Sequence, residues 1–268
     1  MRTNVIENDS IHFCPTCHEP IERILNFPVL DGKGGSTPRK VRILCKCQQA
    51  EKEAYDKRME FEEKQRKINA LRQLSLMDQR LVGVSFDSYQ VTEDNQKAFK
   101  IAKNFVCHFK EMYENHQGLL FWGDVGSGKS YTAAAIANEL IERQVPVIMT
   151  SFIRILNEMD GRDKDNRFID RLKNAKLLII DDLGAERCSD YTLEKVYDII
   201  DSWYRSNNPL IITTNLELGY MKKCDDIRYS RIYDRIFEMC YPVKVSGFSW
   251  RKKEAAARFG DMKKILEG

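Results

Sequence analysis

The sequence predicts an α/β fold in which a parallel sheet is covered by helices on both faces. Short, fully apolar strands alternate with helical segments from about residue 83 onward, as is typical of strands buried on both sides. A glycine-rich loop of the phosphate-binding type stands between one of these strands and the helix after it. Two close pairs of cysteines lie apart from this pattern, within the first 47 residues, and indicate a separate small module.

The elements of the sheet follow from the apolar runs and their spacing. Expected strands cover residues 118–122, 145–150, 175–180, 209–214 and 241–245. Expected helices between them cover residues 129–142, 151–159, 192–204 and 228–239. Ser151 is a suitable N-cap for the second of these helices.

Three regions of different composition divide the 268 residues. Residues 1–50 form the cysteine-rich module, residues 51–80 a helical connector, and residues 81–268 the α/β domain. The connector is rich in Glu, Lys, Arg and Ala, lacks Gly and Pro, and offers i,i+4 charge pairs such as Glu53–Lys57. Between the two cysteine pairs, the segment DGKGGSTPRK is expected to form a turn or hairpin loop.

Composition limits the class of protein. The chain has 43 basic and 40 acidic residues, and the resulting net charge of +3 does not diagnose nucleic-acid binding. No apolar run approaches the ~20 residues that span a bilayer, and MRTNVIENDS has no apolar signal core. We therefore expect a cytoplasmic protein whose eight cysteines are thiols or metal ligands rather than disulfides.

The phosphate-binding loop fits the pattern G-x-x-x-x-G-K-[ST]. Its glycines allow successive backbone N–H groups to turn toward phosphates, and the following helix N-terminus adds partial positive charge. Lys129 would contact the β- and γ-phosphates of ATP, and the Ser130 hydroxyl would bind Mg²⁺. The predicted nucleotide-binding residues here are Gly123, Asp124, Val125, Gly126, Ser127, Gly128, Lys129, Ser130 and Tyr131.

Two acids follow the strand that begins near residue 175, at the edge where ligands bind in open α/β sheets. Asp181 is predicted to hold Mg²⁺ through water, and Asp182 to orient or deprotonate the attacking water. Many ATPases with this loop carry Glu, which is one methylene longer, at the position of Asp182. Glu186 is therefore the alternative candidate for orienting the water. Asn215, after the next apolar strand, could position water against the γ-phosphate, or could be a helix N-cap.

These motifs resemble those of the bacterial and phage replicative helicase loaders, the DnaC/DnaI type of AAA+ ATPase. The similar segments are GLLFWGDVGSGKSYTAAAIANELI, LLIIDDLGAE, LIITTNL, YSRIYDR and VSGFSWR, within about residues 80–255. The resemblance implies a P-loop AAA+ (ASCE) sheet. It also implies no full lid domain, which agrees with the 17 residues that follow Arg251. The transposition helper ATPases of the IstB type share the paired acids.

The resemblance assigns further roles. Asn215 corresponds to the sensor-1 residue and Arg251 to the sensor-2 arginine, which contacts the γ-phosphate of its own subunit. Arg231 corresponds to the arginine finger, which reaches the nucleotide of the next subunit, and Arg235 is the competing candidate. The catalytic set is then Lys129, Asp181, Asp182, Asn215 and Arg231.

The four N-terminal cysteines predict a structural zinc site. A C-x-x-C knuckle at Cys14 and Cys17 can provide one edge of a tetrahedron, and Cys45 and Cys47 the other. Zinc would stabilise a module of ~50 residues that has too little core of its own. His12 or His18 could replace one ligand, and free thiols or a redox pair are the alternatives. Loaders of the DnaI type also carry a Cys-rich N-terminal domain that binds the helicase.

The predicted function is an ATP- and Mg²⁺-dependent ATPase that binds a DnaB-type replicative helicase and single-stranded DNA as a homo-oligomer, with no membrane partner. The alternatives are an IstB-like transposition helper and a nucleotide-gated adaptor with little hydrolysis, suggested by Asp rather than Glu at position 182. Candidate DNA contacts are Phe152, Arg154 and the stretch from Lys164 to Arg167. Phe152 also has the spacing of a core residue.

Overall fold

The computed structural model describes residues 11–28, 36–158, 172, 174–184 and 190–267. The chain divides into two compact units, Met1–Arg66 and Lys67–Gly268. Helix α1 (Lys46–Leu74) contributes its first part to one unit and its last two turns to the other. In the described residues, no helix is long and apolar enough to cross a membrane.

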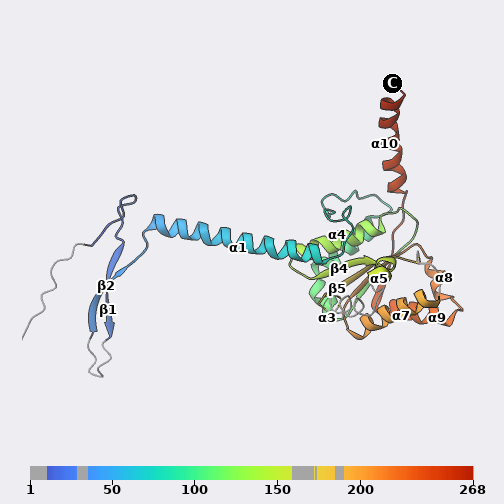
Figure 1. Ribbon diagram of the computed structural model, residues 1–268, viewed down its shortest axis with the longest axis horizontal. Helices are drawn as coiled ribbons and strands as arrows, with labels where there is room; N and C mark the ends of the chain where they lie inside the picture. The colour runs from blue at the N-terminus through green and yellow to red at the C-terminus, as the bar shows by residue number, and fades with distance from the viewer. Residues whose placement is uncertain (1–10, 29–35, 159–171, 173, 185–189, 268) are drawn as a thin grey trace, which may run out of the picture. The chain divides into compact units, whose positions relative to one another are not determined.

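The first unit contains a two-stranded antiparallel ribbon. Strands β1 (Glu22–Pro28) and β2 (Ser36–Arg42) pair with Glu22 opposite Arg42 and Pro28 opposite Ser36 (Figure 1). Residues 36–40, which the sequence assigns to a turn, are therefore strand. The β-branched Thr37 and Val41 suit this conformation, and Pro38 is tolerated because each strand of a two-stranded ribbon is an edge.

The second unit is built on a five-stranded parallel sheet. Its strands are β3 (Gly118–Trp122), β4 (Val147–Ser151), β5 (Leu177–Leu183), β6 (Leu210–Thr214) and β7 (Cys240–Lys244). Their order is β4-β5-β6-β3-β7, and every neighbouring pair is parallel. The predicted α/β class with a parallel sheet is confirmed, and β5 runs three residues farther than expected.

Helices cover both faces of this sheet (Figure 1). They are α2 (Gln96–Cys107), α3 (Phe109–Glu114), α4 (Lys129–Glu142), α5 (Phe152–Glu158), α7 (Asp190–Arg205), α8 (Leu218–Lys222), α9 (Ile227–Met239) and α10 (Trp250–Leu266). Side chains alternate along each strand: Leu177 and Ile179 join the core that contains α2 and α4, whereas Leu178 and Ile180 join the core of α5, α7 and α9. Each face of the sheet is buried under its own helices, which explains why the strands are apolar at successive positions.

The end of α1 is fastened to edge strand β4. Ile68 is fully buried, and the backbone N–H of Met149 donates to the Ser75 carbonyl at 2.8 Å. The Arg154 guanidinium on α5 donates to the Leu76 carbonyl at 2.7 Å. The last turns of the connector helix therefore belong to the hydrogen-bonded framework of the second unit.

Candidate functional site

The loop between β3 and α4 has the backbone geometry of a phosphate cradle. Gly126 and Gly128 have φ of +83° and +102°, a left-handed conformation that side chains disfavour. Gly128 is also the N-cap of α4, so the loop ends at a helix N-terminus, where free backbone N–H groups can bind an anion. A side chain at Gly126 would collide with Ser249, so this glycine is required for close approach as well.

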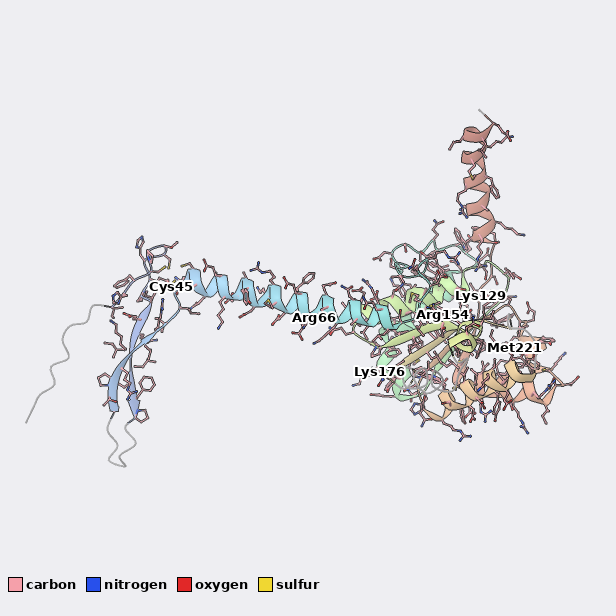
Figure 2. All side chains as sticks on the ribbon, in the orientation of Figure 1. Cys45, Arg66, Lys129, Arg154, Lys176 and Met221 are labelled. Carbon is pink, nitrogen blue, oxygen red and sulfur yellow. The ribbon has the colours of Figure 1, made fainter. Side chains whose placement is uncertain are left out.

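Lys129 is the first residue of α4, directly after this loop, and is labelled in Figure 2. Its ammonium donates to the Gly123 carbonyl at 2.9 Å and to the Asp124 carbonyl at 2.6 Å, and the residue is 6% exposed. Burial lowers the pKa of Lys129, while the nearby carboxylates of Asp182, Asp124 and Asp181 oppose that shift. A buried cation in such a position is suited to an anionic ligand, which would add the opposite charge that it needs.

Strand β5 contains a bulge at its carboxyl end. Ile180 pairs with Ile212 and Leu183 with Thr214, so Asp181 and Asp182 together stand opposite the single residue Thr213. Asp182 has φ of +63°, a left-handed conformation that is uncommon outside glycine. The bulge therefore gives two consecutive carboxylates a geometry that a regular strand could not provide.

Thr213 joins both acids through one hydroxyl group. Its Oγ1 donates to Asp181 Oδ1 at 2.5 Å and accepts from the Asp182 backbone N–H at 2.9 Å. The residue is 1% exposed. Asn215, just beyond β6, donates from Nδ2 to Asp182 Oδ1 at 2.8 Å. Thr213 was not among the residues predicted for the site, although its place one residue before a strand end, next to the acids, was a usable signal.

The segment after β7 packs directly on the phosphate loop. The Trp250 backbone N–H donates to the Gly126 carbonyl at 3.1 Å, and the Val245 N–H donates to the Trp122 carbonyl at 2.9 Å. Ser249 caps α10 by accepting from the Lys252 N–H. Arg251, two residues after Ser249, is exposed, and its charge lowers the pKa of Lys129 further. The contact of Arg251 with a γ-phosphate stays a prediction.

The two candidate finger residues on α9 differ in their surroundings. Arg235 forms an ion pair with Asp201 at 2.5 Å, and its guanidinium lies 4.6 Å from the Tyr197 ring centroid and 5.8 Å from that of Tyr204. Arg231 is exposed and has no ion pair among the residues that the structure describes. Arg235 is therefore part of the contact between α9 and α7, whereas the side chain of Arg231 is exposed on the surface of α9.

Other predicted positions lie in the framework around the loop. Tyr131 donates from its hydroxyl to the Ser88 carbonyl at 3.2 Å. Phe152 is 1% exposed, so its interpretation as a core residue is confirmed. Arg154 is held by the Leu76 carbonyl. Glu186 and the stretch from Lys164 to Arg167 lie outside the described residues.

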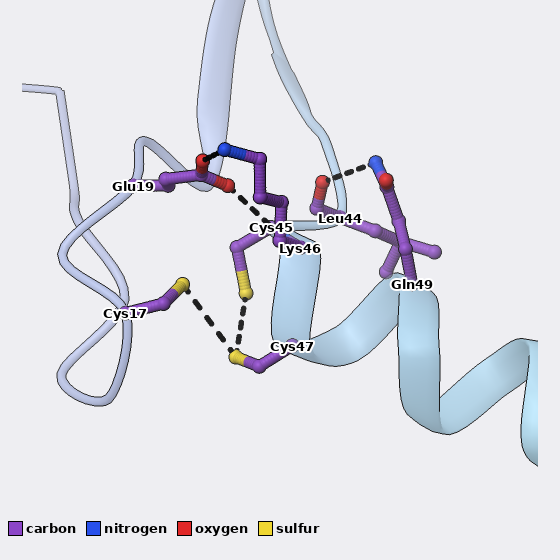
Figure 3. Close-up of polar contacts among 7 residues, drawn as sticks. All are labelled: Cys17, Glu19, Leu44, Cys45, Lys46, Cys47 and Gln49. Atoms are coloured by element: carbon purple, nitrogen blue, oxygen red, sulfur yellow. Dashed lines mark hydrogen bonds and ion pairs between the residues drawn. The ribbon is translucent and has the colours of Figure 1, made fainter.

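The four N-terminal cysteines come together in the first unit, and Figure 3 shows three of them, Cys17, Cys45 and Cys47. The Cys47 sulfur lies 3.4 Å from that of Cys14, 3.1 Å from that of Cys45 and 3.6 Å from that of Cys17, and all four lie within 4.8 Å of one another. A tetrahedral ion with metal–sulfur bonds of ~2.3 Å requires sulfurs about 3.8 Å apart, so the donor set fits zinc. Cys47 lies in the first turn of α1 and Cys45 just before it, so the second pair is on a helix start rather than a strand.

Backbone groups around the cluster favour thiolates. The N–H groups of Cys17 and Thr16 lower the pKa of Cys14 to about 6, and that of Glu19 lowers the pKa of Cys17. Hydrogen bonds from the neighbouring thiols raise the pKa of Cys47, because several close sulfurs cannot all ionise without a cation between them. Four thiolates this close together require a cation between them, as in a metal site with four cysteine ligands.

Comparisons with known proteins agree with this geometry. The model of the family described as IstB-like ATP binding protein matches residues 53–257, more than half of the chain. The phage-like element PBSX protein XkdC of Bacillus subtilis is 28% identical over 197 residues, which are 68% of this chain and 68% of that protein. The replicative helicase loader DnaC of Escherichia coli K12 is 29% identical over 158 residues, which are 57% of this chain and 62% of that loader.

A solved structure gives the same result. The crystal structure of DnaI superposes with a TM-score of 0.56 at 28% identity, over 66% of this chain and 98% of that one. The matched region spans slightly less than two thirds of DnaC. The resemblance drawn from the motifs and the AAA+ fold class are confirmed. This chain belongs to the IstB-like ATP-binding protein family and is similar to its DnaC/DnaI-type helicase loaders.

Proposed function

We propose that this chain is an ATP-dependent loader of a replicative DNA helicase. The observation that carries the proposal is the grouping of Lys129, the Asp181–Asp182 bulge and Asn215 at one edge of the sheet. It is supported by the family and by relatives named as helicase loaders. The expected partners are a DnaB-type helicase, single-stranded DNA and further copies of this chain.

The residues around the loop have separate tasks in this proposal. Lys129 and the N–H groups of the loop would bind the ATP phosphates, and Ser130 and Asp181 would hold Mg²⁺. Mg²⁺ would neutralise charge that develops on the phosphates. Asp182, held by Asn215, would orient the attacking water.

Two arginines complete the proposed site. Arg251 would contact the γ-phosphate from within the subunit, and Arg231 would reach the nucleotide of the adjacent subunit. An arginine supplied in trans makes hydrolysis depend on assembly. In the first unit, Cys14, Cys17, Cys45 and Cys47 would hold Zn²⁺ and so stabilise a module that contacts the helicase.

The direct test is capture of the helicase. The full chain, immobilised with ATP and Mg²⁺, is expected to retain the replicative helicase of its own genome and to show ATPase activity that single-stranded DNA changes. Failure to retain the helicase while a transposase is retained would favour the IstB-like helper. Retention with negligible turnover would favour the nucleotide-gated adaptor, which Asp at position 182 and its hydrogen bond to Asn215 make the second candidate.

Replacing Thr213 with valine is expected to lower kcat by about 10–100-fold and to raise the Mg²⁺ concentration needed for half-maximal activity. The change keeps the shape of the side chain but removes the hydroxyl that donates to Asp181 and accepts from Asp182. Steady-state ATPase assays over a Mg²⁺ series measure both effects.

The sheet offers a matched control for that variant. Thr150 on β4 is also buried, but its hydroxyl has no hydrogen-bond partner among the described residues, so Thr150→Val should leave the Mg²⁺ dependence unchanged. Thr213→Ser retains the hydroxyl and should retain most of the activity. Equal losses in Thr213→Val and Thr213→Ser would mean that packing, not the hydroxyl, is what the site needs.

A further inference from the structure

The β1–β2 ribbon has two faces of different character. In an antiparallel pair, residues directly opposite each other point to the same side, and successive pairs alternate. One face therefore presents Glu22, Ile24 and Asn26 with their partners Pro38, Lys40 and Arg42. The other face, here called the arginine face, presents Arg23, Leu25, Phe27, Thr37, Arg39 and Val41.

Charge is distributed unequally between these faces. Glu22, the acid of the first face, accepts from His12 Nδ1 at 2.7 Å and from Lys40 Nζ at 3.0 Å, and its pKa falls to about 2, chiefly because the His12 backbone N–H also donates to it. The arginine face contains no acid. Within the described ranges, Arg23 and Arg39 have no carboxylate partner. The two guanidinium groups thus remain uncompensated.

The ribbon is basic for its size. Its 14 strand residues include four basic residues and one acid, a net charge of +3. The ribbon is therefore locally basic, and Arg23 and Arg39, which have no carboxylate partner among the described residues, lie on one face of it.

Apolar groups on the arginine face are exposed beside these charges. Phe27 is 40% exposed and Leu25 is 41% exposed. Arg23 stands opposite Val41, and Arg39 opposite Leu25, so the two arginines are diagonal neighbours with Phe27 next along the same face. An aromatic ring beside two neighbouring guanidinium groups can stack on an unpaired base while the arginines contact phosphates.

We propose that the arginine face binds single-stranded nucleic acid. A duplex would offer phosphates but no base face to Phe27, whereas a single strand offers both. This contact is separate from the ATPase unit and requires no nucleotide. It shares its class of ligand with the proposed function but not its site, so each can fail independently of the other.

The test measures binding of a labelled oligothymidylate of about 16 nucleotides to the full, zinc-loaded chain without ATP, by fluorescence anisotropy. Arg23→Ala with Arg39→Ala should weaken binding about tenfold or more, and should reduce the slope of log K against log salt by about 1.4, or 0.7 for each phosphate contact. Phe27→Ala should weaken binding about fivefold or more and leave the salt slope unchanged, because stacking releases no counterions.

The opposite face supplies a control of equal charge. Lys40→Ala with Arg42→Ala also removes two positive charges from the ribbon, both from β2, and should weaken binding less than twofold. Equal losses in the two double variants, or no loss in either, would overturn the proposal. Loss of helicase capture by the arginine-face variant, with oligonucleotide binding intact, would overturn it in favour of an acidic protein partner. Zinc content and ATPase activity verify that each variant is folded.

Discussion

Replacing Lys129 with alanine is expected to weaken ATP binding by about 100-fold or more and to abolish turnover, with the fold retained. Truncating one partner of a buried charge contact typically costs about 2–5 kcal/mol of binding. Within the described part of the chain, the ammonium donates to the Gly123 and Asp124 carbonyls alone, so its loss should cost about 1–3 kcal/mol of stability. Titration with a fluorescent ATP analogue, ATPase assays and thermal melts measure the three quantities.

The control for that experiment is another lysine of the same unit. Lys176 precedes β5 at the amino end of the sheet and contacts the Tyr113 ring at 5.5 Å, so Lys176→Ala should leave ATP binding unchanged. Unchanged ATP affinity and turnover in Lys129→Ala would show that nucleotide binds elsewhere. A melt that falls far below that of Lys176→Ala would show that Lys129 acts mainly through stability.

Replacing Cys14 and Cys17 with serine is expected to reduce bound zinc from about one ion per chain to none and to unfold the first unit. Structural zinc contributes roughly 10–16 kcal/mol in small domains. In the described part of this unit, Cys14 and Cys45 are the buried apolar residues, so no other core could take over. Metal analysis gives the first result, and limited proteolysis gives the second.

The exposed thiol of Cys107 provides the comparison for the zinc experiment. Cys107 is the last residue of α2, far along the chain from the cysteine cluster. Cys107→Ser replaces this thiol and should leave the zinc content unchanged. The second unit has its own sheet and cores, so the double variant should retain the ATP turnover proposed for that unit. Absence of zinc from the unmodified protein, or full zinc content in the double variant, would contradict the assignment.

The strands could be predicted from the sequence because their burial on both faces leaves a continuous apolar signal. Helix α4 was predicted over its full length, since a glycine loop marks its start and apolar residues continue through Ile141. The ribbon was harder to predict. In STPRKVR the short polar residues and Pro38 have the composition of a turn, and exposure on both faces leaves no alternation to detect.

Candidate site residues could be named from the sequence, but the geometry that relates them could not. Nothing in the letters Asp-Asp shows that the strand bulges there, because a bulge is a relation to the neighbouring strand and not a local propensity. The bridging role of Thr213 follows from that relation and was missed for the same reason. Arg231 and Arg235 are one helical turn apart and equivalent in sequence, and only the packing of α9 against α7 distinguishes them.

The order of the strands sets the width of the nucleotide site. Strand β6 is interposed between β3, which carries the phosphate loop, and β5, which carries the acids. Two inter-strand spacings of about 4.8 Å therefore separate the lysine side from the carboxylate side by roughly 10 Å. Backbone hydrogen bonds between the strands fix this separation, so the distance between the strand that precedes the loop and the strand that carries the acids does not depend on the helices that cover the sheet.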